Sequence, residues 1–278
     1  MFDFDLIVIG GGSGGVACAR RAAKYGARVG LIEESNVGGT CVHRGCIPKK
    51  FLVYASHFSH DFEDSVGYGW QPGKLEFDWS TLIKAKTEEL QRLENIYKGL
   101  LSESGVDLIP GRGQFLSPNV VEVGKISYTA KNILIATGGW PSLPTIEGIE
   151  LGINSNDVFD LPSKPERLII LGGGYIACEF AGIFSGLGSQ VTQLYRSEMI
   201  LRGFDHDIRQ TAFDEMQKSG IDIRLGTNIV KIEENSKELI VTSTDGKKHE
   251  ADQVIIATGR KPNTENLGLA QIGVNIDK

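Results

Sequence analysis

The sequence is poor in cysteine and histidine, has no long apolar run and carries no excess of positive charge. Only four of its 278 residues are cysteine and five are histidine. No apolar run is long enough to span a bilayer. The formal net charge of −6 argues against a nucleic-acid partner and favours solubility. We therefore expect a soluble globular protein with no nucleic-acid and no membrane partner.

The length of the chain suggests two domains. Hydrophobic residues make up 41% of the sequence and charged residues 23%, which is normal for a globular protein. Met1 stands only a few residues before the first expected strand, so no targeting segment is expected there and the expected location is cytoplasmic.

The chain contains an internal repeat. An apolar strand, a glycine motif, a helix and a second strand, closed later by an IATG segment, occur over residues 5–138 and again over 167–260. Duplicated units of this kind imply two dinucleotides, one for each unit. The expected fold class is α/β, with two Rossmann-like, three-layer ββα domains.

A cysteine pair follows the first glycine motif, in the segment GGTCVHRGCIPKK. Cys41 and Cys46 are five residues apart, and we expect both on the first turns of a helix, where they can close a disulfide and where the helix N-terminus lowers thiol pKa. A zinc site is less favoured because it usually uses cysteines two to four apart and needs two more ligands. A structural disulfide is disfavoured in the expected compartment. The pair predicts a redox-active disulfide beside a bound cofactor, with no metal site.

The first glycine motif is Gly10-x-Gly12-x-x-Gly15, between a strand and a helix. In such a motif the first glycine makes a tight turn, the second lets the backbone approach a pyrophosphate, and the third lets the helix pack on the strand. Glu33 ends the second strand, where an acid can hydrogen bond a ribose, and Glu34 is the neighbouring alternative. Because the cysteine pair follows at once, FAD is the expected ligand.

The second motif is Gly172-x-Gly174-x-x-Ala177, and no acid ends the strand that follows it. The sequence there is Tyr195-Arg196, with Arg202 six residues later. An acid would bind the 2′-hydroxyl of NAD, whereas arginines bind the 2′-phosphate of NADP through charge-assisted hydrogen bonds. The alternative is that both arginines are merely surface residues. The second site is predicted to bind NADPH.

With these motifs in this order, the chain resembles the pyridine nucleotide–disulfide oxidoreductases. Within that family CVHRGCIPKK is most similar to glutathione reductases of the plant and cyanobacterial type. The resemblance implies NADPH-dependent reduction of glutathione disulfide through FAD. It also implies that residues 1–144 form an incomplete FAD-binding domain, 145–265 the NADPH-binding domain, and 266–278 the start of the return to the FAD domain.

The resemblance also implies a role for individual residues. Cys41 attacks the substrate disulfide, and Cys46 lies against the flavin. Lys49 lies near the reactive part of the flavin and pairs with Glu179, while Tyr175 covers the nicotinamide pocket. The expected cofactor-binding residues are Gly10, Gly12, Ser13, Gly14, Gly15, Glu33, Thr40, Lys49, Thr137, Gly138, Gly172, Gly174, Tyr175, Ile176, Ala177, Glu179, Arg196, Arg202 and Gly259.

The substrate assignment depends on fewer residues. In glutathione reductases the positions that match Ser13, Arg20, Ile96 and Tyr97 contact glutathione, and the arginine holds a glycyl carboxylate. The alternative for Arg20 is that it is simply exposed on an amphipathic helix. Other members of the family remain possible, namely lipoamide dehydrogenase, thioredoxin reductase and, less favoured, mercuric reductase. A non-catalytic redox-sensing module is a further alternative.

Members of the family continue beyond the position that matches Lys278. The continuation holds a second flavin-binding segment and an interface domain, which supplies the homodimer contact and a His–Glu acid–base pair. We therefore expect this chain to be a fragment of a longer enzyme, with the general acid outside it.

Overall fold

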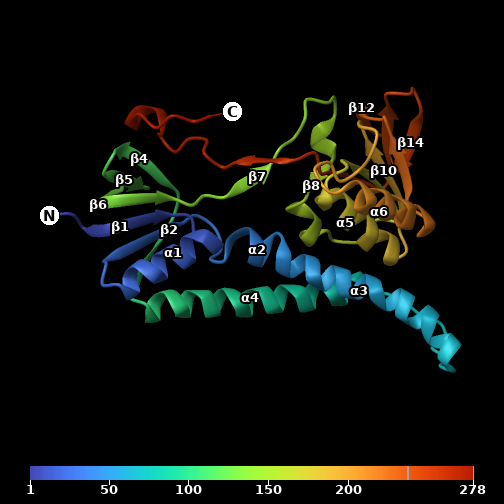
Figure 1. Ribbon diagram of the computed structural model, residues 1–278, viewed down its shortest axis with the longest axis horizontal. Coiled ribbons are helices and arrows are strands. Elements are labelled where there is room, and N and C mark those ends of the chain that lie inside the picture. The colour runs from blue at the N-terminus through green and yellow to red at the C-terminus, as the bar shows by residue number, and fades with distance from the viewer. Residues whose placement is uncertain (237, 278) are drawn as a thin grey trace. The chain divides into compact units, whose positions relative to one another are not determined.

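The computed structural model describes residues 1–236 and 238–277. The chain divides into two compact units (Figure 1). The first unit comprises residues 1–48, 87–140 and 261–278, and the second comprises 49–86 and 141–260. Among the described residues, no helix is long and apolar enough to cross a membrane.

The first unit is built on a six-stranded sheet in the order β3-β2-β1-β6-β5-β4. Its strands β1 (Phe4–Ile9), β2 (Val29–Glu33) and β3 (Val106–Pro110) run parallel, and β4 (Gly113–Ser117) and β5 (Val120–Val123) form an antiparallel hairpin. The first half of β6 (Ile126–Ile135) pairs antiparallel with β5 and its second half pairs parallel with β1. One long strand therefore joins the parallel and antiparallel parts of the sheet.

Both faces of this sheet are covered. Along β1, Val8 packs in one cluster with Val16 and Ala19 of α1 (Ser13–Lys24), whereas Ile7 and Ile9 pack in another with strands β4 and β5. The alternation follows from the two-residue period of a strand. The helix α4 (Trp79–Glu103) contributes Leu101 to the first cluster. The first unit therefore consists of a helical layer, the parallel strands and the antiparallel hairpin.

The second unit repeats this arrangement. Its five-stranded parallel sheet has the order β11-β10-β9-β15-β8, and its strands are β8 (Ile153–Asn154), β9 (Arg167–Leu171), β10 (Gln190–Tyr195), β11 (Asp222–Leu225) and β15 (Gln253–Ile256). The order β11-β10-β9-β15 matches β3-β2-β1-β6 of the first unit. The internal repeat in the sequence is thus a repeat of topology, and the predicted α/β fold with two Rossmann-like domains is confirmed.

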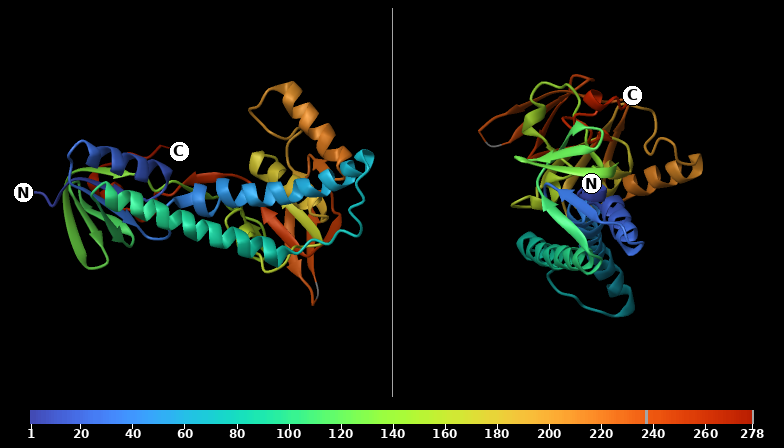
Figure 2. Two further views of the ribbon diagram at one scale, coloured as in Figure 1. Left: turned by 90° about the horizontal axis from the view of Figure 1, so that it is seen from below. Right: turned by 90° about the vertical axis from the view of Figure 1, so that its left-hand side faces the viewer.

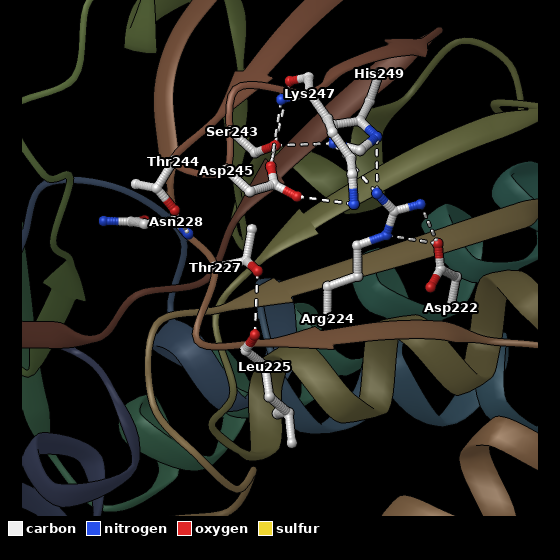
Figure 3. A network of polar contacts seen from close by, with 10 residues as sticks. All are labelled: Asp222, Arg224, Leu225, Thr227, Asn228, Ser243, Thr244, Asp245, Lys247 and His249. Atoms are coloured by element: carbon white, nitrogen blue, oxygen red, sulfur yellow. Dashed lines mark hydrogen bonds and ion pairs between the residues drawn. The ribbon is translucent and has the colours of Figure 1, made fainter.

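The sheet of the second unit is also covered on both faces. The helix α5 (Tyr175–Gly186) packs on one face, and an antiparallel sheet of β12 (Ile229–Glu234), β13 (Leu239–Ser243) and β14 (Lys248–Ala251) packs on the other. The helix α6 (His206–Lys218), orange in Figure 2, has no buried residue. At the edge of the antiparallel sheet, polar residues of β11, β13 and β14 form the network drawn in Figure 3.

Residues 49–86 join the second unit rather than the first. They include most of α3 (Cys46–Ser65) and the first two turns of α4, with the short helix η1 (Val66–Tyr68) between them. Leu52 and Trp79 are buried in the cluster around α5, and the Trp79 ring stacks on Phe184 with centroids 5.8 Å apart. Burial of these apolar side chains holds the segment against α5.

The remaining elements connect the sheets. They are β7 (Gly139–Pro141), η2 (Ile149–Leu151), η3 (Asp157–Asp160), β16 (Arg260–Pro262) and η4 (Ala270–Ile272). After β16, the chain returns to the first unit, where Leu267 and Leu269 are buried in the cluster beside β4.

Candidate functional site

The cysteine pair lies on two helices rather than one. Cys41 is in the five-residue helix α2 (Gly39–His43), and Cys46 is the first residue of α3. Between them the chain turns at Arg44 and Gly45, where a Cβ atom on Gly45 would lie 2.9 Å from the Thr40 carbonyl oxygen. The predicted single helix is therefore wrong, because the turn needs a residue without a side chain. Both cysteines are free thiols in this structure.

The Cys41 thiol is hydrogen bonded to Cys46 and to the hydroxyl of Ser13, the first residue of α1. Burial raises the pKa of Cys41 to about 11, and the neighbouring Cys46 adds to the shift, while the Ser13 hydrogen bond opposes it. The predicted thiolate character of the pair is therefore wrong for Cys41. A five-residue helix offers only a weak dipole, and desolvation of the sulfur outweighs it.

The first glycine motif lines a pocket at the carboxyl ends of β1 and β2. Gly10 has a φ of +110°, and a Cβ on it would collide with the Ala136 carbonyl. Glycine is required here because no side chain fits between this turn and the end of β6. Predicted FAD residues that line the pocket are Gly10, Gly12, Glu33, Thr40, Thr137 and Gly138.

Glu33 is fixed by the backbone around it. One carboxylate oxygen accepts a hydrogen bond from the Gly11 N–H at 2.6 Å, and the other accepts from the Ser35 N–H at 2.7 Å. Each carboxylate oxygen can accept a further hydrogen bond, so Glu33 is oriented to receive the hydroxyls of a ribose. The neighbouring alternative, Glu34, is instead paired with Arg112 at 3.1 Å.

Several residues of this pocket were not predicted from the sequence. Arg112 also donates to the Glu265 carbonyl at 2.8 Å, and so connects the β3–β4 turn to the returning segment. Arg44 lies 5.2 Å from the centre of the Trp140 ring, a cation–π contact. The Asn263 N–H donates to the Gly138 carbonyl at 2.9 Å. These residues come from separate parts of the chain, and no local motif marks them. Arg44, Arg112, Trp140 and Asn263 all line the pocket.

The second glycine motif lines a similar pocket in the second unit. Gly172 has a φ of +144°, and a Cβ on it would collide with the Ala257 carbonyl, just as at Gly10. The Gly172 N–H donates to the Leu194 carbonyl at 2.9 Å, which ties the turn to the end of β10. Predicted residues that line this pocket are Gly172, Gly174, Tyr175, Ile176, Arg196, Arg202 and Gly259.

The pocket is basic at the end of β10. Arg196 follows the last residue of that strand, and Arg202 lies on the loop beyond it. Arg260 and Asn228, which were not predicted, line the same pocket. The residues present fit a dinucleotide with an additional phosphate, because guanidinium groups bind phosphate through charge-assisted hydrogen bonds.

The predicted pairing of Lys49 with Glu179 is present. The Lys49 ammonium donates to both carboxylate oxygens of Glu179 at 2.6 Å, and the two side chains are about 26% and 38% exposed. Lys49 lies on α3 and Glu179 on α5. Partial burial makes each charge dependent on the other. Whether the pair acts on the flavin stays a prediction.

The expected substrate residues lie on α1 and α4. Ser13 is exposed beside Cys41, whereas the Arg20 guanidinium donates to the Ser104 hydroxyl at 3.3 Å. Ile96 is 43% exposed, and Tyr97 packs against the cluster below α1. Ser13 and Arg20 are seven residues apart on one helix and so share a face.

Other predicted cofactor residues line neither pocket. Gly15 and Ala177 are buried where a helix crosses a strand, and Gly14 lies on the first turn of α1. Ser13, Lys49 and Glu179 make the contacts given above. No group of three or more His, Cys, Asp or Glu that could hold a metal ion is found among the residues that the structure describes.

Comparison with known proteins gives a consistent result. The family model for pyridine nucleotide-disulphide oxidoreductases matches residues 4–278. A glutathione reductase of Burkholderia cepacia is 51% identical over 277 residues, which is 100% of this chain and 62% of that protein. A glutathione reductase of Nostoc sp. strain PCC 7120 is 48% identical, over 99% of this chain and 60% of that protein. The chloroplastic/mitochondrial glutathione reductase of Pisum sativum is 45% identical, over 100% of this chain and 52% of that protein.

A solved structure has the same fold. The HOCl-induced flavoprotein disulfide reductase RclA of Escherichia coli, in a complex with Cu(II), superposes with a TM-score of 0.89 at 30% identity, over 100% of this chain and 61% of that chain. The chain thus spans between about half and three fifths of the length of these relatives.

Three predictions from the sequence are confirmed by these findings: the resemblance to glutathione reductases, the fold class, and the cofactors FAD and NADPH. The two glycine-lined pockets fit those cofactors, one in each unit. The chain belongs to the pyridine nucleotide-disulphide oxidoreductases.

Proposed function

We propose that this chain is part of an NADPH-dependent enzyme that reduces glutathione disulfide to glutathione. The observation that carries the proposal is the juxtaposition of Cys41, Cys46 and Ser13 in the unit that holds the FAD-type pocket. Glutathione reductases at 45–51% identity over nearly the whole chain support the choice of substrate. When bound, FAD supplies the two-electron transfer between NADPH and the disulfide.

The proposed chemistry of the cysteines is thiol–disulfide exchange. The Cys41 sulfur attacks one sulfur of glutathione disulfide, which forms a mixed disulfide and releases one glutathione thiolate that takes up a proton. The Cys46 sulfur then attacks the Cys41 sulfur, re-forms the Cys41–Cys46 disulfide and releases the second glutathione. Two electrons from one NADPH are needed to open the disulfide for each cycle.

Cys41 must lose its proton before it attacks. Because burial raises its pKa, ionisation at neutral pH requires a proton acceptor. The resemblance implies a histidine from the second subunit of a homodimer, and we propose that acid–base group and that dimer for this protein. His43 is directed elsewhere, since its Nε2 lies 3.0 Å from the Val37 carbonyl.

In the second unit, we propose that Arg196 and Arg202 bind the 2′-phosphate of NADPH and that Tyr175 covers the nicotinamide pocket. Tyr175 is the first residue of α5 and is 53% exposed, so its ring is free of core packing. For the substrate, we propose contacts with Ser13, Arg20, Ile96 and Tyr97. We also propose a cytoplasmic location. Cysteine pairs in that compartment usually act in redox catalysis, which is the role proposed for Cys41 and Cys46.

A substrate comparison tests the proposed function. NADPH consumption is measured with glutathione disulfide, lipoamide and oxidised thioredoxin as alternative substrates, using the protein with FAD bound. We expect turnover with glutathione disulfide, its loss in Cys41→Ser, and its retention in the matched control Cys18→Ser, which changes a thiol in α1. Turnover only with lipoamide or thioredoxin would contradict the proposed substrate, and no turnover with any of the three would favour a redox sensor.

A further inference from the structure

The loop between β10 and α6 carries both proposed phosphate ligands and is held at several points. It covers residues 196–205, and Arg196, Ser197 and Arg202 line the second pocket. The Ser197 carbonyl accepts a hydrogen bond from the Gly226 N–H at 3.1 Å. Ile200 is fully buried in the cluster around α5. The loop is therefore anchored to the unit on both sides of its turn.

The residue before Arg202 has an unusual backbone conformation. Leu201 has a φ of +55°, which a leucine rarely adopts, which costs free energy and which persists only where the surroundings enforce it. Its N–H donates to the Gly173 carbonyl at 2.6 Å, and its carbonyl accepts from the Phe204 N–H at 3.1 Å. Gly173 belongs to the glycine motif, so this bond ties the loop directly to the phosphate turn.

Arg209, from α6, also holds the loop next to Leu201. It lies on the first turn of α6, whose start is fixed by the Asp205 carboxylate, a hydrogen-bond acceptor for the Asp207 N–H at 3.0 Å. The Arg209 Nε donates to the Ile200 carbonyl at 2.8 Å, and its Nη2 donates to the Met199 carbonyl at 2.9 Å. One planar guanidinium therefore satisfies two successive carbonyls immediately before the strained residue.

Lysine could not reproduce this contact. The guanidinium presents its donors in a fixed, planar fork, whereas an ammonium is a compact point charge on a flexible stem. Removal of Arg209 would leave two partly buried carbonyls without their partner and would remove the restraint that favours the positive φ of Leu201. The bend would relax, and Arg202 is the next residue along it.

We propose that Arg209 is a positioning residue for cofactor selectivity, which acts through the loop to hold Arg202 toward the 2′-phosphate of NADPH. This inference rests on the proposed role of Arg202 and Arg196. Arg209 itself is not proposed to touch the cofactor. Its effect should therefore fall on the additional phosphate and spare the rest of the nucleotide.

The test compares two ligands that differ by one phosphate. Binding of 2′,5′-ADP and of 5′-AMP is measured by calorimetry on the FAD-bound protein, for the wild type, Arg209→Met, Arg209→Lys and Arg202→Met. Arg224→Met is the matched control, because Arg224 lies in the same unit and its side chain pairs with Asp222 at 2.7 Å rather than with a carbonyl of the loop. Retained FAD and an unchanged far-UV circular-dichroism spectrum show that each variant is folded.

We expect Arg209→Met to weaken 2′,5′-ADP binding by about tenfold and to change 5′-AMP binding by less than about twofold. The affinity of Arg209→Lys for 2′,5′-ADP should fall between that of the wild type and that of Arg209→Met. Arg224→Met should bind both ligands as the wild type does. Equal binding of 2′,5′-ADP by Arg209→Met and wild type, or an equal loss for both ligands, would overturn the inference. If Arg209→Met does not fold, the ratio for Arg209→Lys decides by the same criterion.

The wild-type arm separates the inference from the proposal on which it rests. If the wild type binds 2′,5′-ADP no better than 5′-AMP, the assignment of Arg196 and Arg202 is wrong and the inference about Arg209 fails with it. If the wild type discriminates and Arg202→Met does not, the assignment of Arg202 stands, and the Arg209 variants alone decide.

Discussion

The Cys41 thiol lies in a setting that keeps its proton. It is partly buried, and Cys46 lies within hydrogen-bond reach, so ionisation of Cys41 would place a negative charge next to a second sulfur in a medium of low polarity. The Ser13 hydroxyl offsets part of this cost, because it can donate to the thiolate. The raised pKa keeps the Cys41 thiol predominantly protonated at neutral pH.

This electrostatic setting predicts how Cys41 responds to alkylation. In the reduced protein, the rate of carbamidomethylation of Cys41 by iodoacetamide should increase up to about pH 11, because only the thiolate reacts. Ser13→Ala should slow the reaction further at each pH, since it removes the hydrogen bond that lowers the pKa. The rates are measured by mass spectrometry of the peptide that holds Cys41. A rate that levels off near pH 7 would contradict the assigned burial effect.

At the scale of elements, the fold places each glycine motif where a strand ends. The order β3-β2-β1-β6 and its counterpart β11-β10-β9-β15 bring the turn after β1 or β9 next to the end of β6 or β15. That neighbour is why Gly10 and Gly172 admit no side chain: Ala136 directly follows β6, and Ala257 directly follows β15. The glycine motifs were predictable because each is a short pattern between a strand and a helix, although the carbonyls that exclude a side chain lie far away in the sequence.

Other elements were not predictable from local sequence. The membership of residues 49–86 in the second unit depends on Trp79 packing against Phe184, more than one hundred residues away. The pocket residues Arg112 and Asn263 meet only after the chain returns to the first unit. Such contacts follow from tertiary packing, which no periodicity encodes.

The network on the antiparallel sheet gives a prediction for β13 and β14 (Figure 3). The His249 Nε2 lies 3.0 Å from the Ser243 hydroxyl oxygen, and the Arg224 guanidinium lies 3.4 Å from its Nδ1. Burial lowers the pKa of His249, and Arg224 and Lys247 add to the shift, whereas Asp245 and Asp222 oppose it. Because the folded state disfavours the charged ring, its contribution to stability is complete above about pH 6.5, the unfolded value, and declines as the pH falls through the lower folded value.

Hydrogen exchange measures this effect locally. We expect the protection of the β13 and β14 amides, corrected for intrinsic exchange rates, to decrease between pH 7 and pH 5. In His249→Gln the decrease should be smaller, because no ring is left to protonate. His60→Gln, which changes an exposed histidine on α3, should retain the wild-type dependence. Identical pH dependence in wild type and His249→Gln would rule out His249 as its source.

At the scale of the whole molecule, the chain supplies two nucleotide pockets and one pair of thiols. The first pocket and the cysteine pair lie in one unit, and the second pocket with its arginines lies in the other. The two pockets, the family and both cofactors were predictable from the sequence because short motifs specify them. The proton affinity of Cys41 was not, because it depends on burial rather than on helix position.

The measurement that most directly tests the central claim is an anaerobic titration of the oxidised, FAD-bound protein with NADPH. The visible absorbance is recorded after each addition of NADPH, and the free thiols at Cys41 and Cys46 are counted by alkylation and mass spectrometry. Our account predicts that one NADPH yields thiols at both cysteines, together with a long-wavelength absorbance band that is absent in Cys46→Ser. Consumption of NADPH that leaves the Cys41–Cys46 disulfide closed would contradict it.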